Sequence, residues 1–198
     1  MIKLSPSDQL AKTISIVTNP ALVLLVTLLI VVRNYVDSTP DFWWGSLIGF
    51  GLLIVPGLIY STYVWRQEGA VDLDLTERHD RIVPLMLSCL GATIGSYLVQ
   101  SKLHNPTLTE ISFILVTMLA ALTVVTTVWK ISLHAATISG LTTLMVVYRG
   151  GWFALGYLVL LPVIWSRLQL KQHTPNQLIG GTLLGTILTY LAAWFFSR

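Results

Sequence analysis

Charged residues are scarce in this sequence, and their scarcity excludes several classes of protein. Lys, Arg, Asp and Glu make up 11% of the 198 residues, whereas an average soluble domain has about 25%. The formal net charge is +3, which is too small to indicate a polyanionic partner. The composition therefore excludes a disordered chain, a nucleic-acid-binding arm and an ordinary water-soluble domain.

Cysteine is almost absent as well. Cys89 is the single cysteine and stands within an apolar run. One thiol cannot form a disulfide framework within the chain, so no such framework is expected.

Long apolar runs take the place of charge. Hydrophobic residues make up 54% of the chain and the mean hydropathy is +0.74, which indicates a polytopic membrane protein. Backbone polar groups in lipid must be bonded within the chain, so we expect these runs to be helices. Seven apolar segments are apparent, at 13–32, 42–65, 82–100, 108–129, 134–148, 152–165 and 176–196.

Two of these segments, 134–148 and 152–165, are short. The expected fold is therefore all-α, a polytopic membrane protein with six to seven transmembrane helices in one bundle. We expect this bundle to be a single domain over residues 1–198. Pro56 and Gly57 predict a kink inside the second segment.

Polar residues are grouped at three places between these segments: 66–81, 130–134 and 166–173. Two apolar segments separate each group from the next, and an even number of crossings returns the chain to the same side of a membrane. We therefore expect all three groups to meet at one membrane face. That face carries eight Lys and Arg residues against four on the other, which favours a cytoplasmic site. Four of the eight are candidate phosphate ligands, and without them the two faces carry four each.

The third group contains Ser166, Arg167 and His173. Arginine presents a fixed fork of donors that suits a tetrahedral oxyanion such as phosphate. Histidine is the side chain most suited to act as base, acid or nucleophile near neutral pH. The alternative is that Arg167 and Lys171 are interfacial anchors and that His173 is a loop residue.

The second group opens the fifth segment with Lys130, Ser132 and His134. A helix start offers backbone N–H groups and the positive end of the helix dipole to an anion. His134 is placed to donate a proton to a leaving oxygen. The alternative is an interfacial lysine and a histidine bonded to a neighbouring helix, although ionisable residues at membrane depth generally indicate function.

These groups resemble the three signatures of the type-2 phosphatidic acid phosphatase family (lipid phosphate phosphatases). Ser166-Arg167, followed after five residues by His173, resembles the third signature, and Lys130-x-Ser132-x-His134 resembles the second. The stretch 78–84, Arg-His-Asp-Arg-Ile-Val-Pro, resembles the first, which ends in Arg-Pro. The resemblance covers roughly residues 66 to 185.

The resemblance implies a membrane-embedded, metal-independent phosphatase that acts on a lipid phosphate or prenyl (di)phosphate and needs no cofactor. His173 would attack phosphorus and form a phosphohistidine, and His134 would protonate the leaving alcohol. The phosphate oxygens would be held by the remaining polar residues of the three motifs: Arg167, Ser132, Lys130, Arg78 and Arg81. The implied partners are the lipid phosphate substrate and the bilayer, with no nucleic acid and the oligomeric state left open.

The sequence departs from the family pattern at several positions. The family has Asp four residues after the nucleophilic His, where this chain has Gln177. Its amide oxygen can still accept a hydrogen bond from His173, without the charge. The second motif has Ile131 and Leu133 in place of Pro and Gly, and Asp74 stands where the first motif has Lys. The chain is therefore either a divergent active member or a catalytically dead homologue acting as a scaffold or transporter.

The acid-rich stretch offers another alternative. Its carboxylates pair with nearby arginines in a solvated loop, or they coordinate Mg²⁺ on a diphosphate, since hard oxygen ligands suit that ion. In the second case the stretch loosely resembles those of intramembrane prenyltransferases, and it predicts a Mg²⁺-dependent prenyl-diphosphate enzyme. The acids concerned are Glu68, Asp72, Asp74, Glu77 and Asp80.

Overall fold

The computed structural model describes residues 5–68 and 78–198. Within these two ranges all regular secondary structure is helical and no strand occurs. In chain order the elements are α1 (Pro6–Val17), α2 (Pro20–Tyr35), α3 (Thr39–Ile48), a π-helical segment η1 (Gly49–Ile54), α4 (Val55–Glu68), a 3₁₀ turn η2 (His79–Arg81), α5 (Ile82–Leu103), α6 (Pro106–Val128), α7 (Leu133–Arg149), a 3₁₀ segment η3 (Gly151–Val159), α8 (Leu160–Gln169) and α9 (Pro175–Phe196).

Several of these helices begin at a clear sequence signal. Ser5 caps α1 by accepting from the backbone N–H of Asp8, and a proline follows at the first helical position. Asn105 caps α6 in the same way, again with proline next. A capping oxygen satisfies an N–H group that has no partner inside the helix, and proline has no N–H to satisfy there.

Five helical stretches of the described chain are long and apolar enough to cross a membrane, and a sixth is added if the bent pair α1 and α2 is one span. They are Thr39–Tyr63, His79–Leu103, Pro106–Val128, Gly151–Gln169 and Pro175–Phe196. The all-helical, multi-pass character expected from composition agrees with this. The segment expected at 134–148 is helix α7, which is not among the five.

The first expected helix, 13–32, was wrong as a single element. The chain breaks between α1 and α2, whose axes differ by 41°. Pro20 disfavours a helical conformation at the residue before it and cannot donate a backbone hydrogen bond. Asn19 instead caps α2 by accepting from the N–H of Ala21 at 3.0 Å.

The second expected helix, 42–65, is interrupted just before the proline that predicted a kink. The segment η1 widens to a π-helix over Gly49–Ile54, and α4 begins at Val55. Pro56 has no N–H, so it cannot donate to the carbonyl of Leu52 as an α-helical residue would. That carbonyl faces Gly91 of α5, where a Cβ would lie 1.7 Å from its oxygen. Only glycine fits at this contact.

The chain forms two compact units. The first runs up to Leu24 and continues over Ile131–Leu191, and the second consists of Leu25–Lys130 with Ala192–Arg198. The first unit therefore contains α1, α7, η3, α8 and most of α9. The second contains α3 to α6 with most of α2.

Helix α7 is the centre of the first unit, since every residue from His134 to Met145 is buried. Two glycines let α9 approach it closely. A Cβ on Gly181 would lie 2.6 Å from the carbonyl oxygen of Ser132, and one on Gly185 would lie 2.3 Å from that of Ala136. The apolar core of this unit is Ala135, Ile138, Leu160, Val163 and Leu178.

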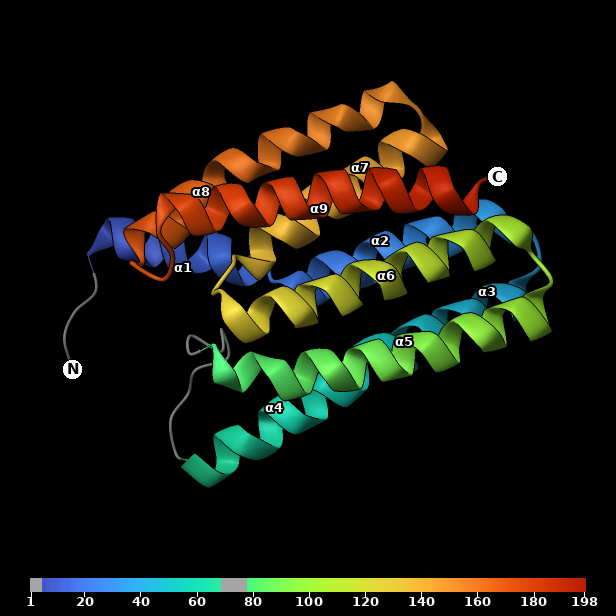
Figure 1. The fold of residues 1–198 in the computed structure, drawn as a ribbon, viewed down its shortest axis with the longest axis horizontal. Helices are drawn as coiled ribbons and strands as arrows, with labels where there is room; N and C mark the ends of the chain where they lie inside the picture. The colour runs from blue at the N-terminus through green and yellow to red at the C-terminus, as the bar shows by residue number, and fades with distance from the viewer. Residues whose placement is uncertain (1–4, 69–77) are drawn as a thin grey trace. The chain divides into compact units, whose positions relative to one another are not determined.

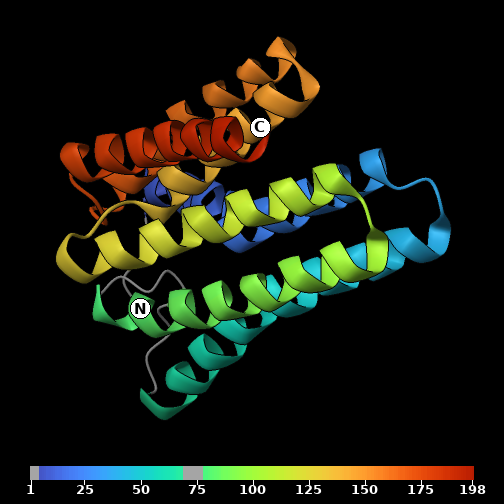
Figure 2. The same cartoon turned by 45° about the vertical axis from the view of Figure 1, so that its right-hand side comes forward.

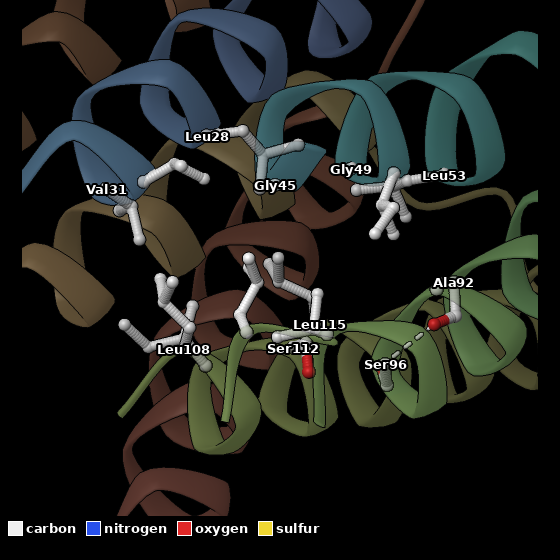
Figure 3. Close-up of a pocket in the computed structure, with 16 residues that line it drawn as sticks. Leu28, Val31, Gly45, Gly49, Leu53, Ala92, Ser96, Leu108, Ser112 and Leu115 are labelled. Atoms are coloured by element: carbon white, nitrogen blue, oxygen red, sulfur yellow. Dashed lines mark hydrogen bonds between the residues drawn. The ribbon is translucent and has the colours of Figure 1, made fainter. Parts of the chain in front are cut away.

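In the second unit α5 and α6 run side by side in opposite directions, as Figure 2 shows, and α3, η1 and α4 contact α5. A cavity of about 50 Å³ lies among α2, α3, α5 and α6 of this unit (Figure 3). Small and aliphatic side chains line it. Ser96 and Ser112, its polar lining residues, donate to the backbone carbonyls of Ala92 and Thr109 in their own helices.

Candidate active site

Buried polar side chains gather in the first unit. Arg167 on α8 is 1% exposed, Ser132 at the start of α7 is 0%, and His134 and His173 are 5% and 6%. Burying a guanidinium is costly unless its N–H groups are bonded. The fold therefore maintains a polar cluster inside an otherwise apolar helical unit, and its members belong to the second and third sequence motifs.

Ser15 of α1 contacts two members of this cluster. Arg167 donates from Nη1 to the hydroxyl oxygen of Ser15, and Nε2 of His134 lies 3.2 Å from the backbone carbonyl oxygen of the same residue. The side chain and the main chain of one residue thus join motifs that are far apart in the sequence. Sequence reasoning did not identify Ser15, because it lies inside an apolar run with no motif around it.

Helix α1 lies against α8 (Figure 1), and two further hydrogen bonds connect it to the C-terminal half of that helix. Ser166 donates to the carbonyl of Ala11 at 2.6 Å, and Gln169 donates to the carboxylate of Asp8 at 2.9 Å. Positions 8, 11 and 15 fall on one face of a helix. Ala11 is fully buried at this contact, so α8 approaches the α1 backbone closely.

Away from this contact, α1 is exposed and carries both apolar and polar side chains. Leu10, Ile16 and Val17 are each more than half exposed, and Lys12 and Thr13 are exposed beside them. Ser15 is therefore the polar side chain of α1 that is buried against the cluster, whereas large apolar side chains of the same helix face outward.

His173 contacts Gln177, the residue four positions later at the start of α9. Its Nδ1 lies 3.1 Å from Oε1 of Gln177, and the N–H of Thr174 donates to the same oxygen at 3.1 Å. An amide oxygen only accepts, so Nδ1 carries the proton and the lone pair of a neutral ring lies on Nε2. This geometry agrees with the expectation that Gln177 can accept a hydrogen bond from His173, and the catalytic role of both residues stays a prediction.

The turn between α8 and α9 brings His173 back toward the start of α7. Lys171 adopts a left-handed backbone conformation with φ +54°, and the N–H of Gln172 donates to the carbonyl of Arg167 at 3.1 Å. The N–H of Ser132 donates to the carbonyl of Gln177 at 3.1 Å. A chain of bonded neighbours therefore connects His173, through Gln177, to the helix start that carries His134.

Ser132 is the N-cap of α7. Its hydroxyl oxygen accepts from the N–H of Ala135 at 3.4 Å, and its backbone is extended. The N-terminal N–H groups and dipole of α7 lie at this end, as the sequence predicted for an anion site. The location of Ser132 agrees with the predicted role, whereas the role itself stays a prediction.

Three predicted phosphate ligands belong to the second unit. Arg81 is 2% exposed at the end of η2, whereas Arg78 and Lys130 are half-buried. Nη2 of Arg78 lies 3.5 Å from Nε2 of His79. Their approach to the cluster of the first unit stays a prediction.

The acidic stretch falls mostly outside the described residues, which is the case for Asp72, Asp74 and Glu77. Asp80 is described and exposed. Over 5–68 and 78–198, no group of three His, Cys, Asp or Glu side chains lies close enough together to hold a metal ion. The predicted Mg²⁺ site on this stretch therefore stays untested.

The cavity of the second unit is a poor candidate for substrate. At about 50 Å³ it is much smaller than the several hundred Å³ that pockets for small-molecule ligands typically have, about 300–1,000 Å³. Its serine hydroxyls already donate to their own helix backbone. The polar cluster of the first unit is therefore the candidate active site.

The cluster has the groups that a phosphoryl-transfer site requires. It provides a cation with several N–H donors, two imidazoles with different partners, a serine hydroxyl at the start of α7 and another in the last turn of α1. In comparisons with known proteins, the chain matches no family model, no curated protein and no solved structure.

Proposed function

We propose that the chain is a membrane-embedded, metal-independent phosphatase that removes phosphate from a lipid phosphate or prenyl (di)phosphate. The observation that carries this proposal is the burial of Arg167 and His134 on a shared partner, Ser15, in the same unit as His173. The order and spacing of the three motifs support assignment to the type-2 phosphatidic acid phosphatase family as a divergent member.

In the proposed reaction, Nε2 of His173 attacks phosphorus while the P–O bond to the alcohol breaks. His134 transfers a proton to the leaving oxygen. Water then loses a proton to His134 and attacks phosphorus, so that the P–N bond breaks and inorganic phosphate leaves. The lone pair on Nε2 that the Gln177 contact implies is the group required for the first step.

In this proposal Arg167 donates hydrogen bonds to the phosphate oxygens. Its guanidinium is held by Ser15, so little reorganisation is needed when charge develops on the transferring group. Ser132 and the N-terminus of α7 act on the same oxygens. Arg78, Arg81 and Lys130 are proposed to complete the cradle when the three polar groups meet at one membrane face, with six helices as the spans of the bundle.

The test is phosphate release by the purified protein from a panel of lipid phosphates, namely phosphatidate, a lysophosphatidate and prenyl mono- and diphosphates. We expect release that persists in EDTA and disappears in H173A. Release that EDTA abolishes would indicate the Mg²⁺-dependent alternative. A folded protein that releases phosphate from none of these lipids would favour the alternative in which the chain is a catalytically dead scaffold.

A further inference from the structure

The hydroxyl of Ser15 accepts from Arg167 but still has a proton to donate. Ser15 is 2% exposed, so bulk solvent has almost no access to it. Helical serines and threonines usually donate to the carbonyl four residues earlier, as Thr18, Ser96 and Thr143 do here. For Ser15 that carbonyl belongs to Ala11, and it accepts from Ser166 instead.

Within residues 5–68 and 78–198, the Ser15 hydroxyl has no acceptor for its proton. The hydroxyl of Ser132 has the same bonding pattern. It is fully buried and its oxygen accepts from the N–H of Ala135. Its proton also lacks an acceptor among the described residues. Buried donors are nearly always bonded in folded proteins. One such donor on the guanidinium of Arg167, with a second at the N-terminus of α7 in the same unit, is an arrangement suited to binding an anion.

We infer that Ser15 is a phosphate-binding residue whose hydroxyl accepts from Arg167 and donates to an oxygen of the phosphoryl group. This inference rests on the proposed function and adds α1 to the site. The hydroxyl is a relay in this arrangement, because it orients the guanidinium and presents its own proton to the same anion. The ligand of Ser15 is a tetrahedral oxyanion, and the lipid to which the phosphate is attached takes no part in this contact.

The backbone of Ser15 supports the same assignment. Its carbonyl oxygen lies 3.2 Å from Nε2 of His134 and only accepts, so this contact puts a proton on Nε2. The residue that binds phosphate therefore also orients the histidine proposed to protonate the leaving oxygen. Helix α1 can hold both contacts because Ser166 and Gln169 fix it to α8 at two other points.

The test compares two variants of equal shape, S15T and S15V. Both add one branch at a buried position, so they share any packing cost, and they differ only in the hydroxyl. We expect S15T to keep kcat/KM within about threefold of the wild type and S15V to lose tenfold or more, in line with the loss of a hydrogen bond to a charged group. S7A is the matched control, because it removes an exposed serine hydroxyl from the same helix and should leave kcat/KM unchanged.

A binding measurement separates this inference from the proposed reaction. Inorganic phosphate and orthovanadate are titrated against each purified variant, and the rise in melting temperature reports binding. We expect saturable stabilisation of the wild type and S15T that is at least tenfold weaker in S15V. If no variant hydrolyses any lipid phosphate but this difference persists, the phosphatase proposal fails and the assignment of Ser15 stands.

The inference is overturned if S15V matches S15T in both turnover and phosphate binding. A third variant, S15A, adds no bulk and serves if the branched variants do not fold. Wild-type turnover and phosphate binding in S15A would overturn the inference equally.

Discussion

Arg167 donates a hydrogen bond to Ser15, which precedes it by 152 residues. The contact joins the third sequence motif to a helix that no motif identified. Both groups are almost fully buried, at 1% and 2% exposure. The candidate active site is therefore built from α1, α7, α8 and the turn before α9, all within one compact unit.

His173 is the proposed nucleophile, and its removal should abolish turnover. We expect H173A to reduce phosphate release to the uncatalysed level while the protein keeps its fold. The measurement is inorganic phosphate against time, with acid-labile ³²P on the protein as the sign of a phosphohistidine in the wild type. H104N is the control, since exposed His104 ends α5 in a left-handed conformation with φ 49° that asparagine accepts. Turnover in H173A equal to that of H104N would exclude His173 as nucleophile.

Gln177 accepts from His173 without providing a charge, so a carboxylate at this position should increase the rate. We expect Q177E to raise kcat by about tenfold, because a carboxylate stabilises the imidazolium better than an amide oxygen does. Q177L removes the acceptor and should lower kcat by about 10² or more. Steady-state rates of the three proteins on one lipid phosphate test this ordering, and equal rates in Q177L and the wild type would contradict it.

Gly181 lets α9 pack against the start of α7. In G181A the new methyl group would meet the carbonyl of Ser132 at 2.6 Å, so we expect a loss of about 1–3 kcal/mol in stability from overpacking and a lower turnover. G151A is the matched control, since a Cβ there meets nothing within 4 Å. Thermal unfolding in detergent measures the difference. An unchanged melting temperature in G181A would mean that α9 does not lie this close to α7.

Ala11 is the point at which α1 touches α8. A11L places a large side chain at a fully buried position and should displace α1, so that Arg167 and His134 lose Ser15 together. We expect a loss of turnover of at least tenfold, with most of the helical content retained by circular dichroism. T13L adds a leucine to the exposed face of the same helix and should stay close to the wild type. Equal losses in both variants would point to a general effect of bulk in α1.

Composition and apolar run length were sufficient to predict an all-helical chain and the approximate position of nearly every helix. They failed at Pro20, which divides one expected helix into two, whereas the irregularity expected at Pro56 is present as the π-helical segment just before it. Hydrophobicity over a 20-residue window does not register a single missing N–H, although that loss decides whether a helix continues. The π-helical segment before Pro56 depends additionally on Gly91, which is distant in the sequence.

The histidines, Arg167 and Ser132 could be identified from residue type and spacing, because ionisable residues are rare in so apolar a chain. Ser15 could not, since serine is common in membrane helices and its neighbours carry no signal. Its importance comes from tertiary contacts alone: the carbonyl that would accept its proton is bonded to Ser166. Such a competition between acceptors is visible only when the two helices are seen together.

Exposed apolar side chains on α1 connect the candidate site to the surroundings of the protein. Leu10, Ile16 and Val17 are exposed on the helix whose Ser15 contacts Arg167 and His134. Micelles and bilayers differ in how tightly they enclose a short helix of this kind. We therefore expect the rate of the proposed reaction to differ between detergent and liposomes, most strongly where acyl chains pack most loosely around α1.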